Sequence, residues 1–273
     1  TDPAFDMDAP VLKDESVRDY QYYSYDARIP NQRGRIELQV QDTSRYFLPG
    51  EAFIEVEGEI LKTDNTEYAA DISVGFVNNG IMALFDSATY MIDGKNIESI
   101  QKDVDVATTI LGLARYSDDY SRSAGPSMMF TKDTSDHPSF TPYNIRRPRN
   151  FADAADADVA SVVHGANANF NLGFTSRRAM LKGNRRTFSC SIPLSHIFGF
   201  CRNVRKVIFR AKHTIELVRK ATDDDAIWRP AGDAGRVILR KLSLWMPVMT
   251  PSISFLSQSV GLRQVVSVTV STH

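Results

Sequence analysis

Segments in which apolar and polar residues alternate one by one recur along this chain. A period of two residues places every second side chain on the same face of an extended strand, whereas a helix needs a period near 3.6. Each such segment therefore predicts a strand with one buried face. The segments lie at residues 36–40, 54–60, 72–76, 188–192 and 207–219. In the second of them, Glu55, Glu57 and Glu59 are expected to form an acidic outer face.

Three further segments are predicted as strands by their apolar content and by the turns that bound them. Residues 90–92 lead into Asp93-Gly94, a pair favoured in two-residue hairpin turns, with a return strand from Asn96. Residues 170–174 are predicted to form another strand. Residues 237–246 form a third, which is expected to end at Pro247.

One helix is predicted among these strands, at residues 103–116. Val104, Ala107, Leu111 and Ala114 recur at helical spacing, and Asp103 is the expected N-cap. A long irregular region with four prolines follows at 117–170, and a short helical turn is expected at 193–198.

The composition fits a globular chain. Hydrophobic residues make up 42% and charged residues 24% of its 273 residues, which excludes a disordered chain and a coiled coil. No segment has the length of uninterrupted apolar residues that a membrane-spanning helix needs. We predict an all-β, antiparallel jelly-roll β-sandwich with one short helix after a hairpin and long loops. An N-terminal arm at 1–30 precedes the jelly-roll domain at 31–252. Residues 253–273, with an alternating segment at 265–270, form an extension or the start of a second jelly roll.

The net charge of −1 hides a split along the chain. Residues 1–172 carry a balance of −13 and residues 173–241 a balance of +11. Such asymmetry fits contact with nucleic acid, complementary surfaces between subunits, or charges that cancel within one fold.

Two groups of residues are candidates for contacts with other molecules. Tyrosines offer apolar area with a polar tip, and they gather in the arm. Basic residues offer charge to a protein or to phosphates. The subunit-contact candidates are Tyr20, Tyr22, Tyr23, Tyr25, Arg146, Arg147 and Arg149, and the basic cluster comprises Arg177, Arg178, Lys182, Arg185 and Arg186.

No familiar motif for phosphate binding, dinucleotide binding or hydrolysis is present, so we expect no catalytic residues and no cofactor. Cys190, His196 and Cys201 lie within twelve residues, but their spacing fits no common zinc site, and packing in the core is the better interpretation. The acidic runs at 223–225 and 153–158 are expected to be solvated turns, although carboxylates also bind hard cations.

Several segments, taken in order, resemble one family of viral proteins. Residues 77–85, with the pair Asn78-Asn79 and an ending Leu84-Phe85, followed by residues 90–97, resemble a signature of the double-jelly-roll major capsid proteins of Polinton elements, adintoviruses and virophages. The helix at 103–116 falls where this family places one. Further segments of the same order are residues 36–38, 53–60, 192–200, 215–220 and 236–252.

This resemblance implies a structural capsid protein that assembles with itself into trimeric capsomers of an icosahedral shell, in the virion of a DNA virus. The implied partners are copies of itself, other capsid proteins and, through weak contacts, packaged double-stranded DNA. Family members carry two jelly rolls, and this chain resembles the first.

Two other functional classes stay open. Jelly rolls also serve as cellular binding modules for carbohydrate or protein, and this is the main alternative. An enzyme on a similar sandwich would need convergent polar groups in a pocket, which the sequence does not identify.

Overall fold

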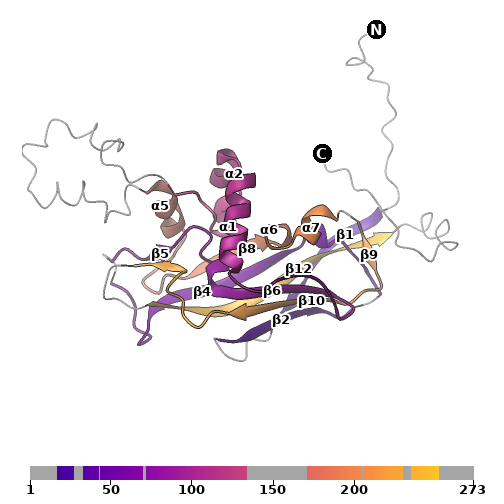
Figure 1. The fold of residues 1–273 in the computed structure, drawn as a ribbon, viewed down its shortest axis with the longest axis horizontal. Coiled ribbons are helices and arrows are strands. Elements are labelled where there is room, and N and C mark those ends of the chain that lie inside the picture. Colours follow the sequence, from indigo (N-terminus) through magenta and orange to yellow (C-terminus); the bar gives the residue numbers. More distant parts are fainter. Residues whose placement is uncertain are drawn as a thin grey trace, which may run out of the picture.

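The protein is a β-sandwich with helices gathered along one side (Figure 1). The computed structural model describes residues 17–27, 33–42, 44–69, 72–133, 171–204, 206–229 and 235–251. The strands are β1 (Val17–Asp26), β2 (Arg35–Val40), β3 (Tyr46–Phe47), β4 (Phe53–Lys62), β5 (Gly75–Phe76), β6 (Phe85–Ile92), β7 (Lys95–Ile100), β8 (Phe188–Pro193), β9 (Ile208–Phe209), β10 (His213–Arg219), β11 (Ile227–Trp228) and β12 (Gly235–Pro251).

Two antiparallel sheets form the sandwich. The six-stranded sheet has the order β8-β4-β12-β3-β9, with β1 paired to β12, and the four-stranded sheet has the order β2-β10-β6-β7. Long strands that follow one another along the chain mostly lie in opposite sheets, as β2, β4 and β6 do. This alternation is the connectivity of a jelly roll, and it confirms the predicted all-β class.

Local alternation accounts for the strands that were predicted. In β2, Ile36, Leu38 and Val40 are almost fully buried between more exposed neighbours, and Ile54 and Val56 of β4 face them from the other sheet. A core of this kind excludes water from both inner faces and holds the sheets together.

The hairpin between β6 and β7 is also as predicted. Asp93 and Gly94 both have positive φ angles, of 50° and 75°. A two-residue turn with two positive φ angles matches the right-handed twist of the strands. Glycine adopts such angles without strain, and aspartate tolerates them better than most residues do.

The structure contains more helix than the sequence indicated. The helices are α1 (Val104–Arg115), α2 (Asp118–Ser123), α5 (Leu172–Ala179), α6 (Leu194–Ile197) and α7 (Gly199–Asn203), with 3₁₀ turns at Pro49–Glu51, Met82–Leu84 and Gly125–Met128. Helix α2 and the third of these turns lie in the region predicted to be irregular, so that prediction was wrong for its first part. Residues 134–170 lie outside the described residues.

The strand predicted at 170–174 is wrong, because residues 172–179 form α5. The Asn171 side chain accepts a hydrogen bond of 3.0 Å from the Phe174 N–H and so caps the helix. Phe174 then packs edge-on against Trp228, with 5.1 Å between ring centroids. The asparagine was a local signal for a helix start that the apolar content of the segment outweighed.

Strand β12 runs through Pro247, where the sequence predicted an end. Its ladder with β4 ends at Trp245, and its ladder with β3 begins at Val248. On the other side, Ala27 donates its N–H to the Leu242 carbonyl, so every second residue of β12 from Leu242 bonds to β1 and Pro247 falls between them. On the side of β3, the Leu48 N–H donates to the Pro247 carbonyl at 3.1 Å. The Leu48 carbonyl, which would pair with the N–H that proline lacks, accepts from the Glu51 N–H at 3.2 Å instead.

The single strand predicted at 207–219 is divided. Arg210 has a positive φ of 56°, which is incompatible with an extended strand and separates β9 from β10. Phe209, predicted on the buried face, is 40% exposed and stacks on Tyr46 with 4.1 Å between centroids.

Candidate functional site

Helix α1 stands upright on the sandwich (Figure 1), and a small polar network fixes its base. Its buried side consists of Val104, Thr108 and Gly112. The Asn79 side-chain amide donates to the Thr108 hydroxyl at 2.8 Å and to the Thr109 hydroxyl at 2.9 Å. Asn79 belongs to the Asn-Asn pair of the sequence signature, so the structure gives that residue a role: it holds α1 in place.

Two side chains extend this network to α6. His196 is fully buried and donates from Nε2 to Asn79 Oδ1 at 3.1 Å. Its Nδ1 then accepts from the Tyr116 hydroxyl at 2.9 Å. Burial disfavours the charged imidazole and lowers the pKa of His196 to about 4, and it raises the pKa of Tyr116 to about 12. Both groups are therefore neutral near pH 7, as the hydrogen bonds require.

The buried face of α1 differs from the predicted one. Ala107 and Ala114 are exposed, whereas Gly112 is buried because the Phe130 ring packs where a side chain would stand: a Cβ there would lie 2.5 Å from the ring. Asp103 makes no side-chain cap and has a left-handed backbone. The tertiary partners Asn79 and Phe130 thus decide how the helix is rotated.

This rotation exposes the apolar side of α1. Val106, Ile110 and Leu113 follow at spacings of four and three, so they share one face, and they are 52%, 63% and 50% exposed. Neighbouring apolar side chains with this much exposure are typical of surfaces that bind another molecule. We call these three residues the α1 face. The predicted helical spacing did not single out these three residues, although a helix with apolar residues on every side was the available signal.

The predicted tyrosines lie on β1, which is paired to β12 of the same chain. Tyr20 donates to Glu51 at 2.5 Å, and burial with this bond raises the pKa of Tyr20. Tyr22 packs against Phe53, with 5.6 Å between centroids. Both rings remain about 40% exposed, so they keep area for contacts with another molecule.

The other face of β1 borders a pocket of about 460 Å³. Tyr23 contributes to its wall beneath Arg45, whose guanidinium carbon lies 4.0 Å from the ring centroid. Tyr25, nearer the sandwich, is half-buried against the core. The residues that line the pocket are Asp19, Gln21, Tyr23, Ser44, Arg45, Tyr46, Phe209, Val248, Met249 and Thr250.

The predicted basic cluster is largely bound within the chain. Arg177 is 1% exposed, donates to the carbonyl groups of Phe76 and Thr131, and pairs with Asp133 at 2.6 Å. Desolvation lowers its pKa. Arg177 therefore joins the α5 region to the body and does not reach the surface.

Two more arginines of the cluster also bind partners within the same chain. Arg185 binds Glu59 through two hydrogen bonds, of 2.5 and 2.9 Å. Arg186 donates to the carbonyl groups of Ala69 and Ile72. Arg178 is half-buried and Lys182 is exposed. Arg146, Arg147 and Arg149 lie outside the described residues.

Ion pairs within the fold join the acidic and basic parts of the sequence. The predicted acidic outer face of β4 is wrong at Glu59, which is 3% exposed and bound by Arg185 and Arg240. Hydrogen bonds from Arg185, opposed by desolvation, lower the pKa of Glu59. Further pairs of the same kind are Asp133–Arg177, Glu67–Arg185, Asp105–Lys220 and Glu55–Lys241. The charge split therefore cancels locally to a considerable extent.

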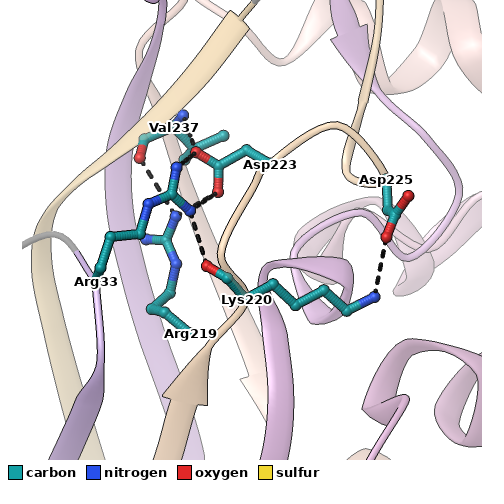
Figure 2. A network of polar contacts seen from close by, with 6 residues as sticks. All are labelled: Arg33, Arg219, Lys220, Asp223, Asp225 and Val237. Carbon is teal, nitrogen blue, oxygen red and sulfur yellow. Dashed lines mark hydrogen bonds and ion pairs between the residues drawn. The ribbon is translucent and has the colours of Figure 1, made fainter.

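Asp223 was predicted to lie in a solvated turn and is instead a buried hub (Figure 2). Its carboxylate accepts two hydrogen bonds from Arg33, of 2.8 and 3.0 Å, and one of 2.6 Å from Arg219. It also accepts from the Val237 N–H at 2.8 Å. The hub joins the end of β10 to the start of β12. Asp224 and Asp225 are exposed, as expected.

The cysteines and histidines of the described chain belong to the core. Cys190 and Cys201 are buried free thiols, and desolvation raises the pKa of each to about 12. His213 is buried and bonded to the Tyr90 hydroxyl at 2.7 Å. Within the described ranges, no group of three or more His, Cys, Asp or Glu side chains is placed to hold a metal ion. No helix there is long and apolar enough to cross a membrane.

Comparison with known proteins gives the class of this fold. No protein-family model matches the chain, and no curated protein matches it. Solved structures do match, and one of them, a chain of a virophage particle, shows that this chain has the fold of a jelly roll from a viral particle. The resemblance drawn from the sequence segments is confirmed at the level of fold.

The match that defines the fold is a chain in the electron cryo-microscopy structure of the Sputnik virophage. Its TM-score is 0.54 at 12% identity, over 93% of this chain and 52% of that one. The chain thus spans about half the length of the Sputnik chain. The Faustovirus major capsid protein (TM-score 0.49, 8% identity, 90% and 56% covered) and the PBCV-1 capsid (0.42, 12%, 88% and 44%) are less similar and add no weight. At this identity the likeness establishes the fold alone.

Proposed function

We propose that this protein is a structural component of a viral or virus-derived capsid, and that it acts by assembly and not by catalysis. The observation that carries the proposal is the jelly roll itself, which superposes over 93% of the chain on a protein of a virophage particle. The site of action is the virion shell, after synthesis inside the host cell. The partners are further copies of this chain and other capsid proteins.

The α1 face supplies a contact suited to such assembly, with a second copy as its occupant. It is apolar, and a rigid network fixes its base. Fully burying an aliphatic side chain contributes about 1.5–3 kcal/mol. Since roughly half of each side chain is exposed, Val106, Ile110 and Leu113 together offer about 3 kcal/mol before the cost of association. A contact of this size is weak alone and becomes effective when many copies cooperate, as in trimeric capsomers of an icosahedral shell.

Two finer proposals follow from the resemblance and from the length of the match. Residues 253–273 lead into a second jelly roll, which fits a chain spanning about half of its Sputnik counterpart. Contact with packaged double-stranded DNA is weak and falls to Arg178 and Lys182, because the other three arginines of the cluster are bound in the fold.

Electron microscopy of the 273-residue chain tests the proposal. We expect three-lobed capsomers or closed particles at moderate salt. Ile110→Asp removes them without lowering the melting temperature. Ile97→Asp, at an apolar position on β7 that is 41% exposed, is the matched control and leaves assembly intact. Monomers under all conditions, combined with binding of a glycan, would favour the alternative of a cellular β-sandwich binding module.

A further inference from the structure

One end of the sandwich is open. Along β1, Ala27 and Tyr25 pack against the main core. Tyr23, two residues further from the core on the same face, is 37% exposed. The face that is covered elsewhere by the opposite sheet therefore becomes the floor of the pocket of about 460 Å³.

The pocket has an apolar wall and a polar rim. Tyr23 and Val248 lie on this inner face, and the Tyr23 ring is 37% exposed. Asp19, Gln21 and Arg45 supply hydrogen-bonding groups around them. Such a pocket fits an apolar side chain carried on a polar backbone.

The chain itself continues from the rim of this pocket. Thr250 lines the pocket and Pro251 ends β12. The next eleven residues, 252–262, contain no charged side chain, and the first of them read Ser252-Ile253-Ser254-Phe255. An uncharged segment enters a pocket without the desolvation cost of an ion. Four extended residues reach about 13 Å, which suffices for Phe255 to return over the pocket.

We propose that this pocket binds the segment directly following β12 of the same chain, with the Phe255 ring inserted beside Tyr23 and Val248. Aromatic rings prefer edge or offset contacts with one another, which the exposed Tyr23 offers. The serines of the segment and its backbone meet the polar rim. Docking of this kind fixes the direction in which the chain leaves the first jelly roll.

Disulfide trapping in the full chain tests the proposal. In the variant Ser44→Cys/Phe255→Cys, one cysteine lies at the pocket and the other in the segment. The control is Thr66→Cys/Phe255→Cys. Ser44 and Thr66 are both exposed, and each follows an aspartate by two residues and bonds to its carboxylate at 2.6 Å, so the two sites match. The native cysteines are buried and do not interfere.

We expect most of the Ser44→Cys/Phe255→Cys variant to form a disulfide within one chain under mild oxidation. The fraction that forms this disulfide in the control is expected to be at least tenfold lower. Phe255→Asp, made as a separate variant, speeds amide exchange at residues 44–46. A disulfide-linked dimer would overturn the proposal in favour of a second copy as occupant. Equal trapping in both variants, or none, would also overturn it. The readout needs no particles, so a failure of assembly leaves it unaffected, and particles without trapping reject the pocket alone.

Discussion

Replacing Asp223 with alanine removes the acceptor of four hydrogen bonds at the centre of the buried hub. Two come from Arg33, one from Arg219 and one from the Val237 N–H. The Arg33 side chain is 41% exposed, so water can hydrate its charge once Asp223 is gone. Arg219 is fully buried, so its charge is left without an ion-pair partner.

The cost follows from that asymmetry. Removing one partner of a buried ion pair typically costs about 3–5 kcal/mol, because the remaining charge stays desolvated. A domain of this size is stable by about 5–15 kcal/mol, and about 1 kcal/mol shifts its melting temperature by about 2–4 °C. We therefore expect Asp223→Ala to melt about 6–20 °C below the unmodified chain.

Thermal unfolding by circular dichroism, with urea unfolding as a second measure, checks this prediction. Asp224→Ala is the control, since Asp224 is half-exposed and pairs only at the surface, with Arg229. It costs at most about 1 kcal/mol. The double variant Asp223→Leu/Arg219→Met recovers much of the loss, because it removes the unpaired charge along with its partner. Equal melting temperatures for the two alanine variants would refute the reasoning.

Three further predictions follow from the geometry. The pKa values of His196 and His213 are about 4 in the folded chain, below the value of 6.5 for an exposed histidine, so the unfolded chain takes up protons first. The free energy of unfolding therefore falls between pH 6.5 and pH 4, by about 3 kcal/mol per histidine, and a flat profile from urea titrations would contradict this. Asn79→Ala loses buried hydrogen bonds worth about 1–3 kcal/mol and speeds amide exchange in α1 relative to β10; unchanged exchange would remove the anchoring role. Arg185→Glu lowers the melting temperature, because it places a second carboxylate beside Glu59, whereas Lys182→Glu leaves it unchanged; equal effects of the two would contradict the assignment.

Many of the strands, one turn and the main helix could be predicted from local sequence patterns. The period of two in β2 and β4 fixed which residues face inward, since neighbouring side chains of a strand point to opposite sides. The pair Asp93-Gly94 specified its turn, because both positions need a positive φ. The existence of α1 was likewise a local matter of helical spacing.

The candidate surfaces depended on partners distant in sequence. The α1 face is exposed because Asn79 and Phe130 turn Thr108 and Gly112 inward, and no local pattern records those contacts. The role predicted for Tyr20 and Tyr22 as subunit contacts stays a prediction, although both lie exposed on β1.

The sequence by itself determined the class of fold, because strand alternation, turn residues and the order of family-like segments are all written in short stretches of chain. Only the tertiary structure decided the burial of charge. Asp223, Arg177 and Glu59 read as polar surface residues, yet each is buried because arginines, carboxylates or carbonyl groups from distant strands and loops satisfy it. The cost of burying a charge depends on what surrounds it in space, and that information lies in the packing of the whole chain.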